Sequence, residues 1–205
     1  MNAYKFLRPG AIGPFSGIAW TTEWIAPEGG VSACERRHLP LWIWEELWVI
    51  ELGDDVESRG HKLRAPRARL AQRIDAWSAD TAKSFARACA RRAALHASGP
   101  LRAAGHDAAA AVFAEANDLA GVRDLTSELW DDLPAQVQRP VGMASDGCRR
   151  ALAATASEEP YIAAHGGAVS AYIAVMTAGR VGDPALQTAE RAWQADWLAD
   201  ALGLA

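Results

Sequence analysis

The sequence predicts an α+β protein in which a small N-terminal antiparallel sheet packs on a C-terminal, alanine-rich helical bundle. Six of the nine tryptophans lie before residue 80, whereas alanine dominates after it. Near the same position the apolar pattern changes from the short runs typical of strands to the three- and four-residue spacing typical of helices. We therefore expect residues 1–79 to form a tryptophan-rich, β-containing segment and residues 80–205 to form the bundle.

Three stretches of the first segment favour strands. Tyr4–Leu7 is the first. Leu41–Leu52 is rich in aromatic and β-branched residues, which suit a pleated surface. Its latter part, Leu47–Leu52, is apolar at almost every position and is expected to be a central strand. Lys62–Ile74 is expected to be extended, with an interruption at Pro66, so an antiparallel sheet is the simplest arrangement.

The second segment predicts six helices. The first is expected to begin with Asp80 as its N-cap and to stop at Pro100. The last, Pro184–Leu202, has proline in its first turn and is followed by a glycine, as is typical of helix ends. The four between them are Asp107–Leu119, Arg123–Leu133, Asp146–Ala156 and Tyr161–Ala178.

Composition bounds the function. The 205 residues carry a net charge of -4, which gives no general attraction to phosphate backbones or anionic lipid, so neither nucleic acid nor a membrane is expected as a partner. The N-terminus lacks a secretory pattern and no apolar run spans a bilayer, so a cytoplasmic location is expected. Cys34, Cys89 and Cys148 include no Cys-x-x-Cys pair, and we expect neither disulfide, metal nor cofactor.

The densest polar cluster offers catalytic candidates. Cys34 and His38 precede Trp42 and Trp44, and the carboxylates of Glu45 and Glu46 follow. Apolar surroundings can shift the pKa of such groups toward neutrality, as acid–base catalysis requires. A structural loop with ordinary surface charges is the competing interpretation.

A row of tryptophans is the best indication of a binding surface. Trp42, Trp44 and Trp48 follow one another at spacings of two and four residues, so on one strand without a bulge they would share a face. Such a row could bind an aromatic or cationic ligand by stacking and cation–π contact. It could equally belong to the core or to a domain interface.

A basic run follows the strand candidates. Between Arg59 and Arg73 the sequence has six Lys or Arg residues and no acidic one. On a strand, Arg67, Arg69 and Arg73 would lie on one side and could form an anion site or a protein-docking stripe. A solvated sheet face is the alternative.

The helical segment offers little chemistry of its own. His96, His106 and His165 are isolated among alanines. This segment has no Glu-x-x-His or His-x-x-x-His pair that would place two metal ligands on one helix face. The common phosphate-binding, dinucleotide-binding and serine-hydrolase motifs are absent.

The N-terminal segment resembles an uncharacterised region of actinobacterial proteins. The resemblance rests on Tyr4–Gly10, Pro14–Gly17, Leu39–Trp42 and Glu46–Leu52. Those relatives carry a Gly-Ile-His-Ala-Cys type segment before the Leu-Pro pair, where this chain reads Ser-Ala-Cys-Glu-Arg-Arg-His.

The C-terminal third is similar to helical immunity proteins of polymorphic toxin systems. This similarity rests on Ala163–His165, Ala171–Ala174, Glu190–Gln194 and the Trp197–Leu198 pair. It implies a cytoplasmic helical scaffold that binds a protein partner and performs no chemistry.

Two interpretations of function follow. The first is an interaction protein, in the manner of an immunity protein, that engages a protein partner or small molecule through its tryptophan-rich sheet. The second is a small-molecule enzyme, for example of secondary metabolism, whose acid–base pocket lies between sheet and bundle. The sequence leaves open whether the protein is an enzyme.

Overall fold

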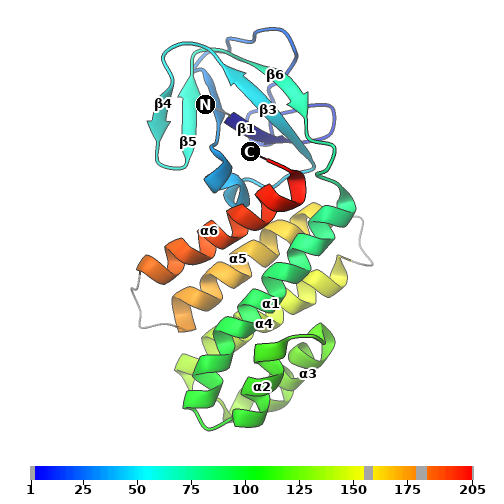
Figure 1. The fold of residues 1–205 in the computed structure, drawn as a ribbon, viewed down its shortest axis with the longest axis vertical. Helices are drawn as coiled ribbons and strands as arrows, with labels where there is room; N and C mark the ends of the chain where they lie inside the picture. The colour runs from blue at the N-terminus through cyan, green and yellow to red at the C-terminus, as the bar shows by residue number, and fades with distance from the viewer. Residues whose placement is uncertain (1–2, 155–158, 179–183, 205) are drawn as a thin grey trace. The chain divides into compact units, whose positions relative to one another are not determined.

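The computed structural model describes residues 3–154, 159–178 and 184–204. Its strands all precede residue 74 and its long helices all follow residue 78, so the α+β class is confirmed for the described residues (Figure 1). The chain divides into two compact units. The sheet unit comprises residues 1–81 and 195–205, and the helical unit comprises residues 82–194.

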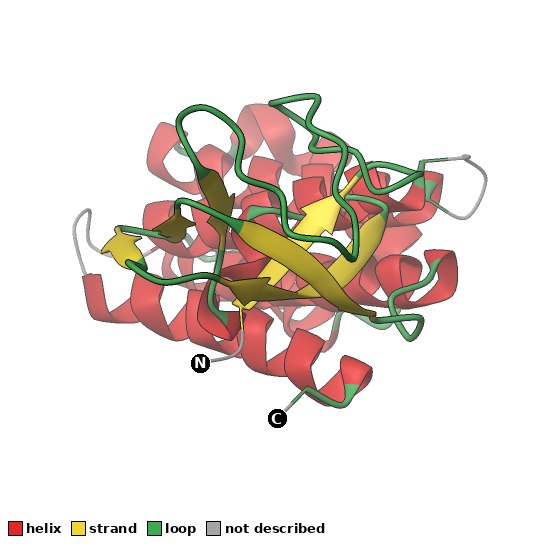
Figure 2. Cartoon of the chain, turned by 90° about the horizontal axis from the view of Figure 1, so that it is seen from above, coloured by secondary structure: helices red, strands yellow, loops and turns green. Residues whose placement is uncertain are grey.

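The sheet unit contains two three-stranded antiparallel sheets where one was expected. The order is β1-β3-β6 in one sheet and β2-β5-β4 in the other. β3 lies in the middle of its sheet, which confirms the predicted central strand. The elements are β1 (Ala3–Leu7), β2 (Val31–Ala33), the 3-10 helix η1 (Arg36–Leu41), β3 (Glu46–Leu52), β4 (Glu57–Arg59), β5 (Lys62–Ala65) and β6 (Ala68–Arg73). Figure 2 shows these strands in yellow, with long green loops joining them.

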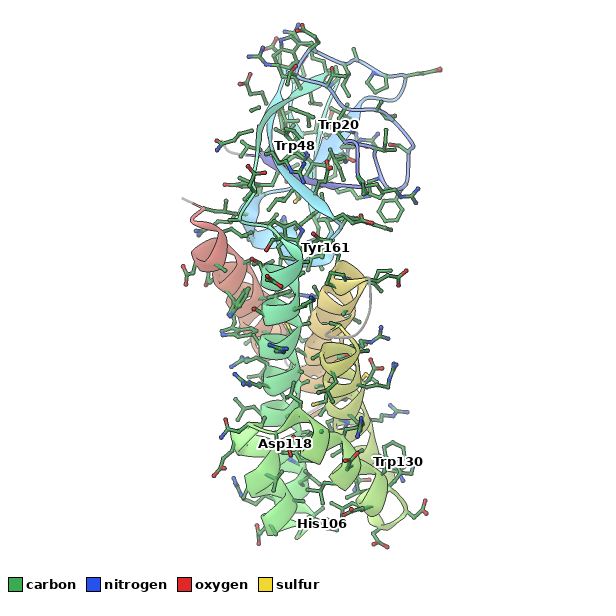
Figure 3. The ribbon with its side chains drawn as sticks, turned by 90° about the vertical axis from the view of Figure 1, so that its right-hand side faces the viewer. Trp20, Trp48, His106, Asp118, Trp130 and Tyr161 are labelled. Atoms are coloured by element: carbon green, nitrogen blue, oxygen red, sulfur yellow. The ribbon has the colours of Figure 1, made fainter. Side chains whose placement is uncertain are left out.

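Both sheets contribute to one apolar cluster. Its buried members are Ala3, Leu7, Trp20, Val31, Ala33, Ile50, Leu63, Ala65, Ala68 and Leu70. Trp48 packs against this cluster from β3, and Figure 3 labels it together with Trp20. Because side chains alternate along a strand, Lys5 shares the face of β1 that carries Ala3 and Leu7. The amine of Lys5 is thereby brought beside apolar side chains.

The structure corrects the prediction that Trp42, Trp44 and Trp48 share a strand face. β3 begins only at Glu46, and Trp42 and Trp44 lie in the connection that joins η1 to it. The segment before Trp42 winds into a 3-10 turn that ends with the Trp42 N–H donating to the Leu39 carbonyl at 3.0 Å. Pro40, which has no N–H for a sheet ladder, suits this turn better than a strand.

A β-bulge corrects the predicted arginine stripe. Arg69 pairs with Glu51 of β3, whereas Arg73 pairs with Trp48, because the register shifts between Val49 and Ile50. A one-residue shift moves side chains to the opposite face of a strand. Arg69 and Arg73 therefore lie on opposite faces of the sheet.

Most of the helices that follow differ in their bounds from what the local pattern predicts. They are α1 (Ala79–Ala103), α2 (Asp107–Glu115), α3 (Leu119–Leu129), the 3-10 turn η2 (Trp130–Asp132), α4 (Ala135–Ala153), α5 (Pro160–Ala178) and α6 (Pro184–Leu202). α1 contains Pro100 in place of stopping there, and its first turn is capped by Ser78 Oγ, which accepts from the Thr81 N–H at 3.3 Å. The predicted Asp80 N-cap is therefore wrong. α6 has the predicted bounds.

Small residues let the helices of the helical unit approach closely. A Cβ atom added to Gly167 of α5 would lie 3.4 Å from the Ala86 Cα of α1, and one added to Gly147 of α4 would lie 3.5 Å from the Ala90 Cα. Alanines fill most of the remaining interface positions of α1 and α5. This confirms the expected compact, alanine-lined bundle.

Within the described residues α5 is the one helix long and apolar enough to cross a membrane by length and composition. Buried helices of soluble proteins reach the same hydropathy. Two of its polar groups bond to other helices: Ser170 Oγ donates to Asp146 Oδ2 at 2.9 Å, and the Tyr172 hydroxyl donates to Gln187 Oε1 at 3.0 Å. We therefore describe α5 as a helix of the bundle.

Candidate functional site

One pocket of the sheet unit contains two of the predicted tryptophans. Its volume is about 180 Å³, and all its lining residues belong to the sheet unit. They are Tyr4, Lys5, Phe6, Pro14, Phe15, Ser16, Ser32, Ala33, Cys34, Trp42, Trp44 and Lys62. Cavities of roughly 150 Å³ hold a benzene molecule. The pocket is therefore large enough for one aromatic ring.

Aromatic side chains form much of the pocket wall. Trp42 and Trp44 are each half-buried, so part of each ring remains accessible. Phe15, whose side chain is 79% exposed, meets Trp44 edge to face with ring centroids 6.0 Å apart. The Trp42 indole N–H donates to the His61 carbonyl at 3.3 Å, which fixes the orientation of that ring. Such walls suit stacking against a flat ligand.

The charged side chains that line the pocket are both lysines. Lys62 Nζ lies 4.7 Å from the centroid of the Trp42 ring, and Lys5 Nζ lies 4.9 Å from that of Trp20. Lys5 also donates to the Ser32 carbonyl. Burial lowers the pKa of Lys5 to about 8, with a further lowering from Lys62 that the neighbouring Cys34 opposes. The amine is still mostly charged at neutral pH.

Cys34 does not have the properties of a nucleophile. Burial raises the pKa of its thiol to about 12. Because the thiolate is the reactive form, this thiol is inert near neutral pH. Cys34 is therefore a buried, unreactive thiol, and burial moves its pKa away from neutrality.

Glu46 has a structural position. Its carboxylate accepts hydrogen bonds from the N–H groups of Gly10 and Ala11, each at 3.2 Å, and from the Trp48 indole N–H at 3.1 Å. Gly10 and Ala11 both have positive φ, at 77° and 58°, so the carboxylate holds a tight turn whose backbone N–H groups would otherwise lack partners. Glu46 does not line the pocket of Trp42 and Trp44.

The other two catalytic candidates also lie outside that pocket lining. His38 packs against His61 with ring centroids 4.9 Å apart, and burial together with the charges of His61 and Arg37 lowers the pKa of His38. Glu45 Oε2 is buried and has no hydrogen-bond partner among the described residues. His38, Glu45 and Glu46 are therefore not assembled around the aromatic pocket, and their catalytic role stays a prediction.

The predicted binding arginines are held by carboxylates. Arg67 Nη2 lies 3.2 Å from Asp54 Oδ2, and Arg69 Nη2 lies 2.7 Å from Glu51 Oε2. Both guanidinium groups also lie over Trp24, at 4.9 and 5.1 Å from its centroid. Their charge is thus compensated locally, which leaves less attraction for an external anion than the basic run suggests.

A buried polar network in the helical unit was missed by the sequence reasoning. Glu190 of α6 is fully buried, and its Oε2 accepts from Arg92 Nη2 at 2.9 Å and lies 2.7 Å from His96 Nε2, both on α1. Its Oε1 accepts from Gln194 Nε2 at 3.1 Å, which also donates to the Ala168 carbonyl. His96 is therefore not an isolated histidine, contrary to expectation.

The spacing of the network residues along the sequence could have indicated this network. Arg92 and His96 are four residues apart, as are Glu190 and Gln194, so each pair shares a helix face. His106, by contrast, lies at the N-terminus of α2 without a side-chain cap bond, and Figure 3 shows it at the end of the bundle. Among the residues that the structure describes, no group of three His, Cys, Asp or Glu side chains could hold a metal ion.

The network makes stability depend on pH. Burial alone would raise the pKa of Glu190, but the hydrogen bond from His96 and the charge of Arg92 outweigh it and hold the pKa below its ordinary 4.5. A lowered folded-state pKa stabilises the fold above pH 4.5 and loses that contribution as pH falls. We expect the difference in melting temperature between the unmodified protein and Glu190→Gln to shrink below pH 4.5. A melting-temperature difference that stays constant as the pH falls below 4.5 would contradict the lowered pKa of Glu190.

The described geometry thus gives one aromatic, lysine-bearing pocket in the sheet unit and one buried ionic network in the helical unit. No family model, curated protein or solved structure matches this chain.

Proposed function

We propose that this chain is a binding protein whose sheet unit takes a small, flat ligand into the pocket of Trp42 and Trp44. The observation that carries the proposal is that these two tryptophans line one pocket together with Phe15, whose ring meets that of Trp44. Clustered aromatic side chains bury large areas and contribute much of the energy of recognition. Binding sites are typically concave and mostly apolar, with a few placed polar groups, as here.

Fluorine NMR with three small probes tests this function. The probes are para-fluorobenzoate, para-fluorobenzyl alcohol and para-fluorobenzylamine, which share a ring and differ in charge. The fluorine signal of at least one probe should broaden or shift when the unmodified protein is added. Trp44→Ala should weaken its binding about tenfold or more, because a wall of the pocket is removed.

The control is Trp24→Ala, which removes a 41% exposed tryptophan that does not line this pocket. It should leave probe binding unchanged, as should His96→Ala, His106→Ala and His165→Ala once each is shown to be folded. Equal losses in Trp24→Ala and Trp44→Ala would contradict a site at Trp44. Binding of none of the three probes would overturn the proposed function.

A further inference from the structure

We infer that the ligand of this pocket is a monocyclic aromatic anion, whose negative group lies between Lys5 and Lys62 while its ring contacts Trp42 and Trp44. The inference rests on the proposed function and adds the chemical class of the ligand. It follows from which groups line the pocket, how the lysines are already engaged, and how much space the pocket offers.

The charge of the lining has one sign. Lys5 and Lys62 line the pocket, and none of its lining residues is Asp or Glu. Cys34, the other ionisable group beside Lys5, stays neutral because burial raises its pKa to about 12. The two ammonium groups therefore have no carboxylate in the lining to compensate them, in contrast to Arg67 and Arg69, which are each held by a carboxylate.

The hydrogen-bonding capacity of Lys5 is not exhausted. An ammonium group has three donors, and the Ser32 carbonyl takes one of them. The low-polarity surroundings of Lys5 strengthen its attraction to an anion, since charges interact more strongly when they are shielded from water. An entering carboxylate would both neutralise this charge and accept from it.

The cations beside the aromatic walls disfavour the cationic ligand that the tryptophan row first suggested. Lys62 already lies over Trp42, and the Arg8 guanidinium lies 5.4 Å from the Trp44 centroid. One cation of the protein thus already lies over each ring, and these cations together with Lys5 would repel a cationic ligand. The ring faces that remain accessible suit a flat apolar group, and the volume of about 180 Å³ suits a single ring.

The three fluorinated probes separate this inference from the proposed function. We expect para-fluorobenzoate to bind the unmodified protein most tightly, the alcohol more weakly and the amine most weakly. Lys62→Met should weaken benzoate binding by up to about fivefold, the upper end of what an exposed ion pair contributes. Lys5→Met should weaken it about tenfold, because hydrogen bonds to a charged and half-buried group are stronger. Neither change should weaken binding of the alcohol.

The matched control is Arg64→Met. Arg64 lies on β5, two residues from Lys62, and its side chain donates to the Gly29 carbonyl without lining the pocket. Arg64→Met removes the same net charge as Lys62→Met or Lys5→Met. Unchanged benzoate binding in Arg64→Met would therefore exclude a general effect of the protein's net charge. If the alcohol and the amine bind as tightly as benzoate and Trp44→Ala abolishes all three, the anion inference is overturned while the proposed function stands.

Discussion

Arg92→Met is expected to lower the free energy of unfolding by about 3 kcal/mol, because it leaves the Glu190 carboxylate buried without its arginine partner. The Arg92 side chain is 28% exposed and Glu190 is fully buried, so the carboxylate cannot recover water when the guanidinium is removed. His96 and Gln194 remain beside it and limit the loss. Urea denaturation followed by far-ultraviolet circular dichroism measures the change.

Arg149→Met provides the comparison for this prediction. Arg149 also pairs with a carboxylate of the helical unit, Asp146, but its side chain is 62% exposed, and Asp146 keeps Arg150 and Ser170 as partners. Exposed pairs of this kind contribute at most about 1 kcal/mol. If both variants lose the same amount, the burial of Glu190 has no special energetic role.

Gly167→Leu is the second change with a large expected effect, about 3 kcal/mol of destabilisation, the upper part of the range for overpacked cores. The Cβ alone would lie 3.3 Å from the Ala86 carbonyl oxygen and 3.5 Å from the Cys89 Cβ, so a leucine side chain has no space without moving α1 away from α5. Thermal unfolding of the purified variant measures the effect.

Gly99→Leu is the matched control on α1. Gly99 is exposed and helical, and an added Cβ would meet no atom within 4 Å other than those of its chain neighbours and of its own helix backbone. Leucine has a better helix propensity than glycine, but Gly99 precedes Pro100, whose ring disfavours the helical backbone of a residue that carries a Cβ. These two effects oppose each other, so the stability of this variant should change by less than about 1 kcal/mol. A Gly167→Leu protein as stable as Gly99→Leu would show that α1 and α5 do not pack as described.

The separation of strands from helices follows from local pattern. The apolar run Leu47–Leu52 became β3, and Pro184–Leu202 became α6 with unchanged bounds. Period and end signals act over a few residues, so a single sequence displays them directly. Helix ends that depend on packing were placed less well: α4 begins at Ala135, eleven residues before the predicted Asp146, because its first turns are buried at Val137 and Val141.

The candidate site was found in part. Trp42 and Trp44 were predicted to act together, and they line one pocket, although for a different reason than a shared strand face. The lysines of that pocket were not predicted. Lys5 and Ser32, which bond to each other, lie on different sheets, and their proximity depends on a pairing that no local pattern displays.

The sequence by itself determined the α+β class and the change from strands to helices near residue 80, because spacing and composition are local properties. Only the tertiary structure decided which charges meet. Arg92 and Glu190 are 98 residues apart, yet they form an ion pair inside the helical unit. The bulge in β3–β6 sends Arg69 and Arg73 to opposite faces although their sequence spacing suggests one stripe. Partners and faces are set by register and helix packing, which depend on contacts between distant segments.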